Sequence, residues 1–205
     1  MLNTYFNSRN NPDFLFVNIV LKNINFAIIA LEYIFNDFYY NIGLYHDEHT
    51  YYFYHIQSLL TACGNISNVF YSTSREKVAK ERSERLRSLF DISNEKYPLI
   101  FQKEVRNTNE HFDERYEQFD NCIGDYNILD DDTDQFMRAV ITSNPHLRTY
   151  DRAKRIYITY NRKKEQIKYN LKDLQKELSN MQKEIQKSPL FIDNWVDSID
   201  NETIK

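Results

Sequence analysis

Apolar residues recur at helical spacing through the first half of the chain. From Phe14 to about Tyr40 they step by three and four residues, which predicts a long and largely buried helix. The apolar positions of this helix are Val17, Val20, Leu21, Ile24, Ile28, Leu31 and Phe35. A second helix is predicted over 48–71, where we expect a run of four aromatic residues to pack in the core and in an interface between subunits. That run is Tyr51, Tyr52, Phe53 and Tyr54.

Two more helices are predicted before residue 122. Ser74 opens the third helix, which runs to about Phe90, and residues 91–98 interrupt the pattern at Pro98. Over 99–121 the apolar residues fall within a narrow arc when they are placed at 100° per residue, which predicts one amphipathic helix. These residues are Phe101, Val105, Phe112, Tyr116 and Phe119. The pattern up to residue 122 therefore predicts a bundle of four main helices.

The pattern changes after Cys122. The acidic segment that follows is turn-like, does not fit the calcium-loop spacing, and predicts a loop that enters a short helix. Two β-prone runs, 155–160 and 166–169, flank the polar sequence NRKKE and predict a short β-hairpin. Because an isolated hairpin is only marginally stable, we expect it to pack on the bundle.

A final amphipathic helix is predicted after Asn170, which we expect to cap it. Its apolar stripe most simply docks on the protein's own surface, with a short coiled coil between two subunits as the alternative. The stripe consists of Leu171, Leu174, Leu178, Met181 and Ile185, and the tail residues Phe191, Ile192 and Trp195 are expected against the core. The fold class is thus mainly α: an antiparallel helical bundle over 14–122 and a C-terminal extension over 123–205 packed on it.

Composition limits the possible functions. The 205 residues are 41% hydrophobic and 15% aromatic, which indicates a folded protein. A formal net charge of −4 excludes a globally basic nucleic-acid binder, so any contact with RNA must use a local basic patch or a small site. We expect Cys63 and Cys122 to be buried free thiols in a reducing cytoplasm. The start of the chain lacks the pattern of a signal peptide, and polar residues interrupt the apolar segment 14–35, so we expect a cytoplasmic protein without a membrane span.

The predicted helix over 99–121 carries the candidate chemistry on its polar face. Within about one turn it holds a cation, an amide and an imidazole, in Arg106, Asn107 and His111. Histidine can transfer the protons of a ribose 2′-hydroxyl or a leaving 5′-oxygen near neutral pH, and arginine can stabilise the phosphate as charge builds up. Asn107 lies four residues before His111, where it could orient the ring or hold a phosphate oxygen. This trio suits phosphodiester cleavage of RNA without a metal or other cofactor.

These residues also carry a resemblance to a known family. Arg106-Asn107-x-x-x-His111 is similar to the Arg-x4-6-His signature of HEPN domains (higher eukaryotes and prokaryotes nucleotide-binding), whose Arg is usually followed by a polar residue. The resemblance covers about residues 14–122 and implies a helical bundle, a homodimer that brings two motifs to one cleft, and metal-independent ribonuclease activity. It also implies a toxin or defence effector, for which an antitoxin or regulatory protein is a possible partner.

The same residues allow other interpretations of function. A non-catalytic module could use the same polar face to bind RNA, a nucleotide or a protein, and an exposed Arg and His on one helix can also arise by accident. Lys103, Arg82 and Arg85 are candidate RNA-binding residues, although the alternating charges of the third helix are also typical of a solvated face. His46, His49 and His55 suggest a metal site, but no further ligand pair has the required spacing, so we expect turn and surface histidines.

Overall fold

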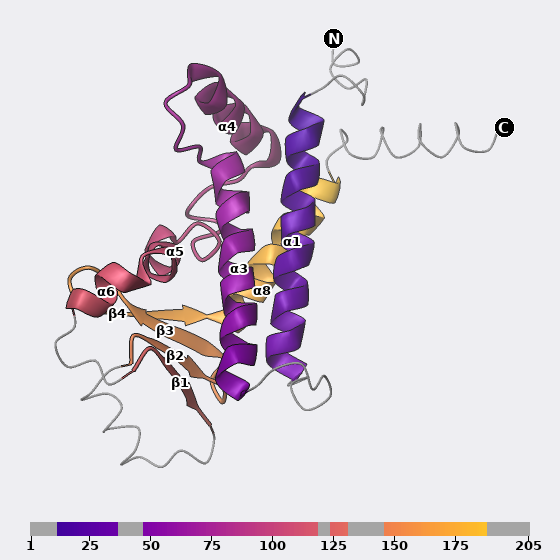
Figure 1. The fold of residues 1–205 in the computed structure, drawn as a ribbon. Coiled ribbons are helices and arrows are strands. Elements are labelled where there is room, and N and C mark those ends of the chain that lie inside the picture. Colours follow the sequence, from indigo (N-terminus) through magenta and orange to yellow (C-terminus); the bar gives the residue numbers. More distant parts are fainter. Residues whose placement is uncertain (1–11, 37–46, 119–123, 131–145, 188–205) are drawn as a thin grey trace, which may run out of the picture.

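An antiparallel pair of long helices forms the centre of the protein (Figure 1). The computed structural model describes residues 12–36, 47–118, 124–130 and 146–187. Helix α1 (Pro12–Asn36) runs antiparallel to α3 (Glu48–Phe70), and α8 (Leu171–Lys187) packs on α1. Helix α4 (Lys77–Phe90) follows at the far end of α3. The mainly helical class predicted from the sequence is confirmed.

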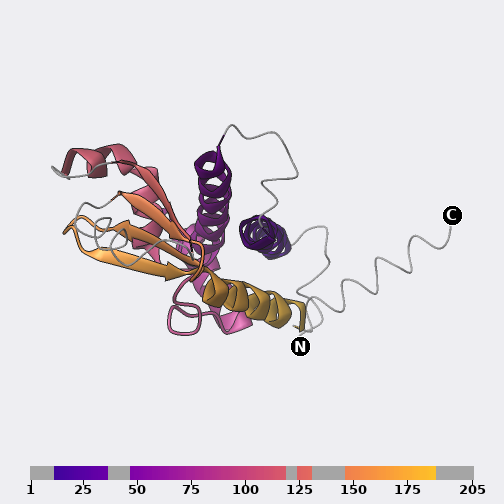
Figure 2. The same ribbon diagram turned by 90° about the horizontal axis from the view of Figure 1, so that it is seen from below.

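A four-stranded sheet lies on the side of α3 that faces away from α1 (Figures 1 and 2). Its strands are β1 (Tyr126–Leu129), β2 (Arg148–Asp151), β3 (Ile156–Tyr160) and β4 (Gln166–Asn170), in the order β1-β2-β3-β4. Strands β1 and β2 are parallel, and the other neighbours are antiparallel. The predicted hairpin is therefore confirmed as β3 and β4, but it belongs to a larger sheet. The prediction of a loop at β1 was wrong, and the short helix predicted after it lies outside the described residues.

One hydrophobic core joins the helices to the sheet. Buried residues of α1, α3 and α8 belong to the same cluster as Tyr150, Tyr157 and Tyr169 of the strands. All five residues of the predicted α8 stripe are fully buried, so its docking on the protein's own surface is confirmed. Asn170 caps this helix as predicted, because its Oδ1 accepts hydrogen bonds from the backbone N–H groups of Lys172 and Asp173. Bundle and extension thus share one core, while Cys122 and the tail lie outside the described residues.

The predicted single helix over 99–121 is wrong. Residues up to Phe101 form turns, α5 (Lys103–Glu110) ends before His111, and α6 (Phe112–Gln118) follows it. Thr108 lies in α5, and its hydroxyl donates to the carbonyl oxygens of Glu104 and Tyr160, at 2.9 and 3.1 Å. Such side-chain bonds to the preceding turn compete with regular helix geometry and bend helices. The helix is thus interrupted close to the residue, Thr108, that bonds to β3.

Helix α1 is more apolar than we expected from its polar residues. By length and composition alone, Asp13–Asn36 could cross a membrane, despite the polar residues that were expected to exclude a span. In the structure, one face of the helix is buried against α3 and α8. At its C-terminus, the guanidinium of Arg155 donates to the carbonyl oxygens of Ile34 and Phe35, at 3.1 and 2.9 Å. Arg155 therefore satisfies carbonyls that the helix itself leaves without a donor.

Candidate functional site

A polar cleft of about 410 Å³ separates α5 from the turn between β3 and β4. Helix α5 and the residue after it form one wall, and the turn forms the other. The lining residues are Glu104, Asn107, Thr108, His111, Asn161, Arg162, Lys163 and Glu165. The hydrogen bond from Thr108 to the carbonyl of Tyr160, described above, joins the two walls at the base. The cleft is within the size range of ligand sites.

The hairpin turn is held in one shape by Asn161. Its Oδ1 accepts hydrogen bonds from the backbone N–H groups of Lys163 and Glu165, at 2.9 and 3.0 Å, and its Nδ2 donates to the Glu165 carboxylate at 2.7 Å. Lys164 has a φ of 63°, a left-handed conformation that is common near the end of a hairpin turn. Asn161 thereby fixes the backbone that carries Arg162 and Lys163 at the cleft.

His111 stands at the rim of the cleft, immediately after the last residue of α5. Its backbone N–H donates to the carbonyl of Asn107, and both side chains line the cleft. The His111 side chain is 49% exposed, and its Nδ1 lies 3.6 Å from Oε1 of Glu114. The other oxygen of Glu114 lies 3.4 Å from a guanidinium nitrogen of Arg162. One carboxylate therefore links the imidazole on the helix side to a cation on the hairpin side.

Arg106 faces the opposite direction. Its Nη2 donates to Oγ of Ser67 in α3 at 3.3 Å, and a Cβ atom added to Gly64 would lie only 3.0 Å from its Nη1. The guanidinium therefore lies against α3, where glycine leaves room for it, and it does not line the cleft. The structure brings Asn107 and His111 together, but within one subunit it does not bring Arg106 to them.

The environment of Arg106 is part of the protein interior. Burial raises the pKa of the neighbouring Cys63 thiol to about 12, although the charge of Arg106 acts in the opposite direction. Cys63 is a buried free thiol, as the sequence predicted, and is protonated at neutral pH. Burial also raises the pKa of Glu177, whose carboxylate accepts hydrogen bonds from the backbone N–H groups of Leu99 and Ile100. Arg106 thus packs against α3, and the turn residues before α5 are bonded to α8, so this region serves the structure of the protein.

The candidate RNA-binding residues of α4 make structural contacts. Arg85 forms a bidentate ion pair with Asp13 of α1, with two nitrogen–oxygen distances of 2.7 Å. The guanidinium of Arg82 lies 4.0 Å from the centre of the Phe16 ring. Both residues attach α4 to α1 and neither lines the cleft; α4 lies at the end of α3 that is far from the strands (Figure 1). Lys103 is exposed at the first position of α5 and is not among the residues that line the cleft.

The structure adds residues that the sequence analysis did not select. Arg162 and Lys163 belong to the NRKKE sequence, which was interpreted only as a polar connection between strands. Three consecutive cations in a short turn were the available signal. These cations lie far from the Arg106–His111 segment in sequence, so no local pattern indicated that the two segments meet. They meet because α5 packs against β3.

The histidines outside the cleft have different surroundings. His49 is exposed on the first turn of α3, His55 is buried, and His46 lies outside the described residues. Within the described ranges, no group of three or more His, Cys, Asp or Glu side chains is placed to hold a metal ion.

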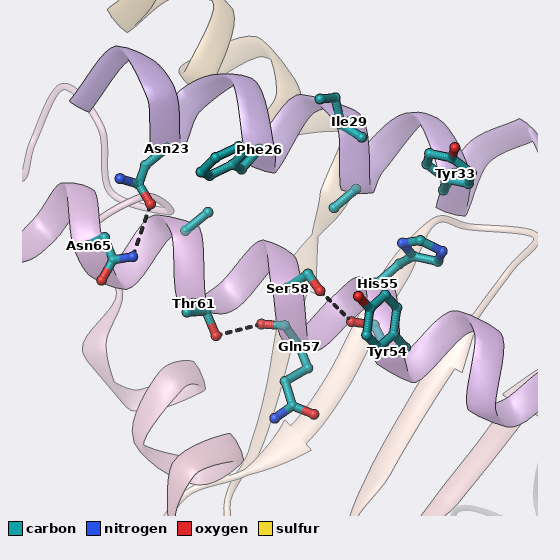
Figure 3. Close-up of a pocket in the computed structure, with 12 residues that line it drawn as sticks. Asn23, Phe26, Ile29, Tyr33, Tyr54, His55, Gln57, Ser58, Thr61 and Asn65 are labelled. Carbon is teal, nitrogen blue, oxygen red and sulfur yellow. Dashed lines mark hydrogen bonds between the residues drawn. The ribbon is translucent and has the colours of Figure 1, made fainter. Parts of the chain in front are cut away.

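A larger groove, of about 590 Å³, runs between α1 and α3 (Figure 3). Phe26, Ile29 and Tyr54 are exposed along it, and Asn65 of α3 donates to Asn23 of α1 at 3.0 Å across one end. At the other end the His55 ring stacks on Tyr33, with ring centres 4.7 Å apart. Of the expected aromatic run, Tyr51, Tyr52 and Phe53 are buried in the core as predicted, whereas Tyr54 is exposed. The groove contains none of the predicted site residues.

No protein-family model, curated protein or solved structure matches the chain. The assignment of a function therefore depends on the residues and geometry described above.

Replacing Arg106 with alanine should destabilise the fold, because the variant loses the bond to Ser67 and the packing of the side chain on α3. We expect the free energy of unfolding to fall by about 1–2 kcal/mol. His111→Ala is the matched control, and at this exposed site the change should stay within about 0.5 kcal/mol. Urea denaturation followed by circular dichroism measures both. Equal stabilities for the two variants would contradict a structural role for Arg106.

Stability should also depend on the protonation of His55. Burial lowers the pKa of its imidazole to about 4, so between about pH 6.5 and 4 the unfolded chain binds more protons than the folded protein. The contribution of His55 is therefore complete above pH 6.5 and is lost as the pH falls through this window. From pH 7 to 4.5 we expect wild type to lose roughly 1–3 kcal/mol more stability than His55→Phe, measured by urea denaturation. Identical pH profiles would contradict this assignment.

Proposed function

We propose that the protein is a metal-independent endoribonuclease of the HEPN type. The observation that carries the proposal is the placement of His111, whose imidazole stands at the rim of a polar cleft beside Asn107 and two cations of the hairpin turn. A phosphodiester in this cleft would lie within reach of a proton-transfer group, an amide and positive charge. These are the groups needed for RNA cleavage by the ribose 2′-hydroxyl.

The proposed reaction forms one bond and breaks one. The 2′-oxygen attacks the adjacent phosphorus while a base removes its proton, and the 5′-oxygen leaves with a proton from an acid. The products are a 2′,3′-cyclic phosphate and a 5′-hydroxyl. His111 serves as one of these two proton-transfer groups, with the His111 of a second subunit as the other, and Asn107 orients the imidazole or holds a non-bridging oxygen.

The role of Arg106 in this proposal rests on the family resemblance. In that family the arginine stabilises the charged phosphate, which in this chain would require Arg106 to leave Ser67 or a second subunit to bring its own motif to the cleft. We therefore propose a homodimer as the active form, with an antitoxin or regulatory protein as a possible partner.

A second function is favoured by a specific observation. Because Arg106 faces α3 rather than the cleft, a module that binds RNA or a nucleotide without cleaving it is the alternative. Binding of RNA by a protein that leaves it intact over long incubation would select this alternative.

Cleavage of a labelled RNA in excess EDTA tests the enzymatic proposal. Wild type should cut the RNA and leave a cyclic phosphate, and His111→Ala should be at least about 100-fold slower. His49→Ala is the matched control, because His49 is also exposed but lies at the start of α3; it should cut at the wild-type rate. Cleavage that survives the loss of His111, or that stops in EDTA, would contradict the proposal.

A further inference from the structure

We propose that the phosphate-binding cations of this site are Arg162 and Lys163 of the hairpin turn, and that Glu114 competes with the phosphate for Arg162. The inference rests on the proposed function in that it takes the cleft as the place where RNA binds. It goes further because it assigns the phosphate-binding cations to the hairpin. Within one subunit, Arg106 does not reach the cleft.

The two cations of the hairpin turn face the residues of the α5 side across the cleft. Arg162 and Lys163 line the wall opposite Asn107 and His111, so a phosphate between the walls would contact both sets of residues. Arg106 contacts α3 instead. Among the described residues that line the cleft, the two cations, Arg162 and Lys163, both belong to the hairpin turn.

The backbone of the hairpin turn is already ordered without a ligand. Asn161 fixes the turn through its three side-chain hydrogen bonds, and the buried Thr108 hydroxyl fixes the start of the turn against α5. Because the backbone is already ordered, binding a phosphate would require ordering of only the two cationic side chains. Preorganisation of this kind favours binding, since less conformational freedom is lost.

Carboxylates offset the cations of the cleft. Because Glu104 and Glu165 line it together with Arg162 and Lys163, a phosphate is bound by direct contact with the two cationic side chains and not by a net positive field. Glu165 is held by Asn161, whereas Glu114 lies 3.4 Å from Arg162. The Arg162 and Glu114 side chains are 70% and 49% exposed, so their ion pair is weak and a phosphate can replace the carboxylate. Glu114 therefore acts as a competitor for the same cation.

The test uses binding rather than cleavage. The probe is a short, fluorescein-labelled single-stranded RNA with 2′-O-methyl groups, which cannot undergo attack by the 2′-oxygen, and fluorescence anisotropy gives its Kd. Arg162→Ala and Lys163→Ala should each raise the Kd about tenfold and make it less dependent on salt. Lys172→Ala, which removes one exposed cation from α8, is the charge-matched control and should change the Kd less than twofold.

Glu114→Gln provides a change of opposite sign. This nearly isosteric variant keeps the side-chain shape but removes the negative charge beside Arg162, so it should lower the Kd about threefold or more. If Glu114 had only a structural role, Glu114→Gln would not lower the Kd, and that result would contradict the competition with the phosphate.

The outcomes separate this inference from the proposed function. RNA binding that depends on Arg162 and Lys163, by a protein that does not cut, would support the inference and remove the ribonuclease. Cleavage that requires His111, with binding that Arg162→Ala and Lys163→Ala leave unchanged, would overturn the inference and keep the ribonuclease. A wild-type protein that does not bind the probe would also overturn the inference.

Discussion

The contact between α5 and β3 is the constraint on which the candidate site depends. Thr108 is fully buried, and its hydroxyl shares a proton between the carbonyl of Glu104 in its own helix and that of Tyr160, 52 residues further along the chain. Loss of a partner by a buried polar group costs about 1–3 kcal/mol, so separation of the two elements is disfavoured. This contact brings His111 opposite the hairpin turn and turns an isolated helical segment into one wall of a cleft.

Helix geometry explains why the Arg106–His111 segment divides between two surfaces. In a regular helix, five residues at 100° each would place these two side chains roughly 140° apart. His111 follows the last residue of α5 but keeps a helix-like backbone bond to Asn107, so the two side chains point in different directions. In the fold, α3 occupies the side that Arg106 faces, and the hairpin occupies the side that His111 faces. The spacing in sequence suggested that Arg106 and His111 share one catalytic site. In the fold, Arg106 instead makes a structural contact with α3, and His111 lines the cleft. For the proposed enzyme, the second subunit or the hairpin must then supply the phosphate-binding cation.

Local signals predicted a large part of the fold, and long-range pairing accounts for the rest. The apolar pattern predicted α1, α3 and α8, and the two β-prone runs that flank NRKKE predicted the hairpin. Strands β1 and β2 are only four residues long and pair in parallel, and because parallel neighbours are not joined by a tight turn, no hairpin signal marks them in the sequence. The marginal stability of an isolated hairpin was the available hint of a larger sheet. In the site, Asn107 and His111 were predicted from their own helix, whereas Arg162 and Lys163 depend on the contact that Thr108 makes.

The central claim is that RNA phosphate binds between His111 and the hairpin turn. NMR titration of the protein with the 2′-O-methyl RNA tests this claim most directly, because arginine Nε–H and histidine ring signals report separately on each candidate residue. Our account predicts that the signals of His111 and Arg162 shift together as the RNA is added. A shift of Arg106 with no change at Arg162 would contradict it.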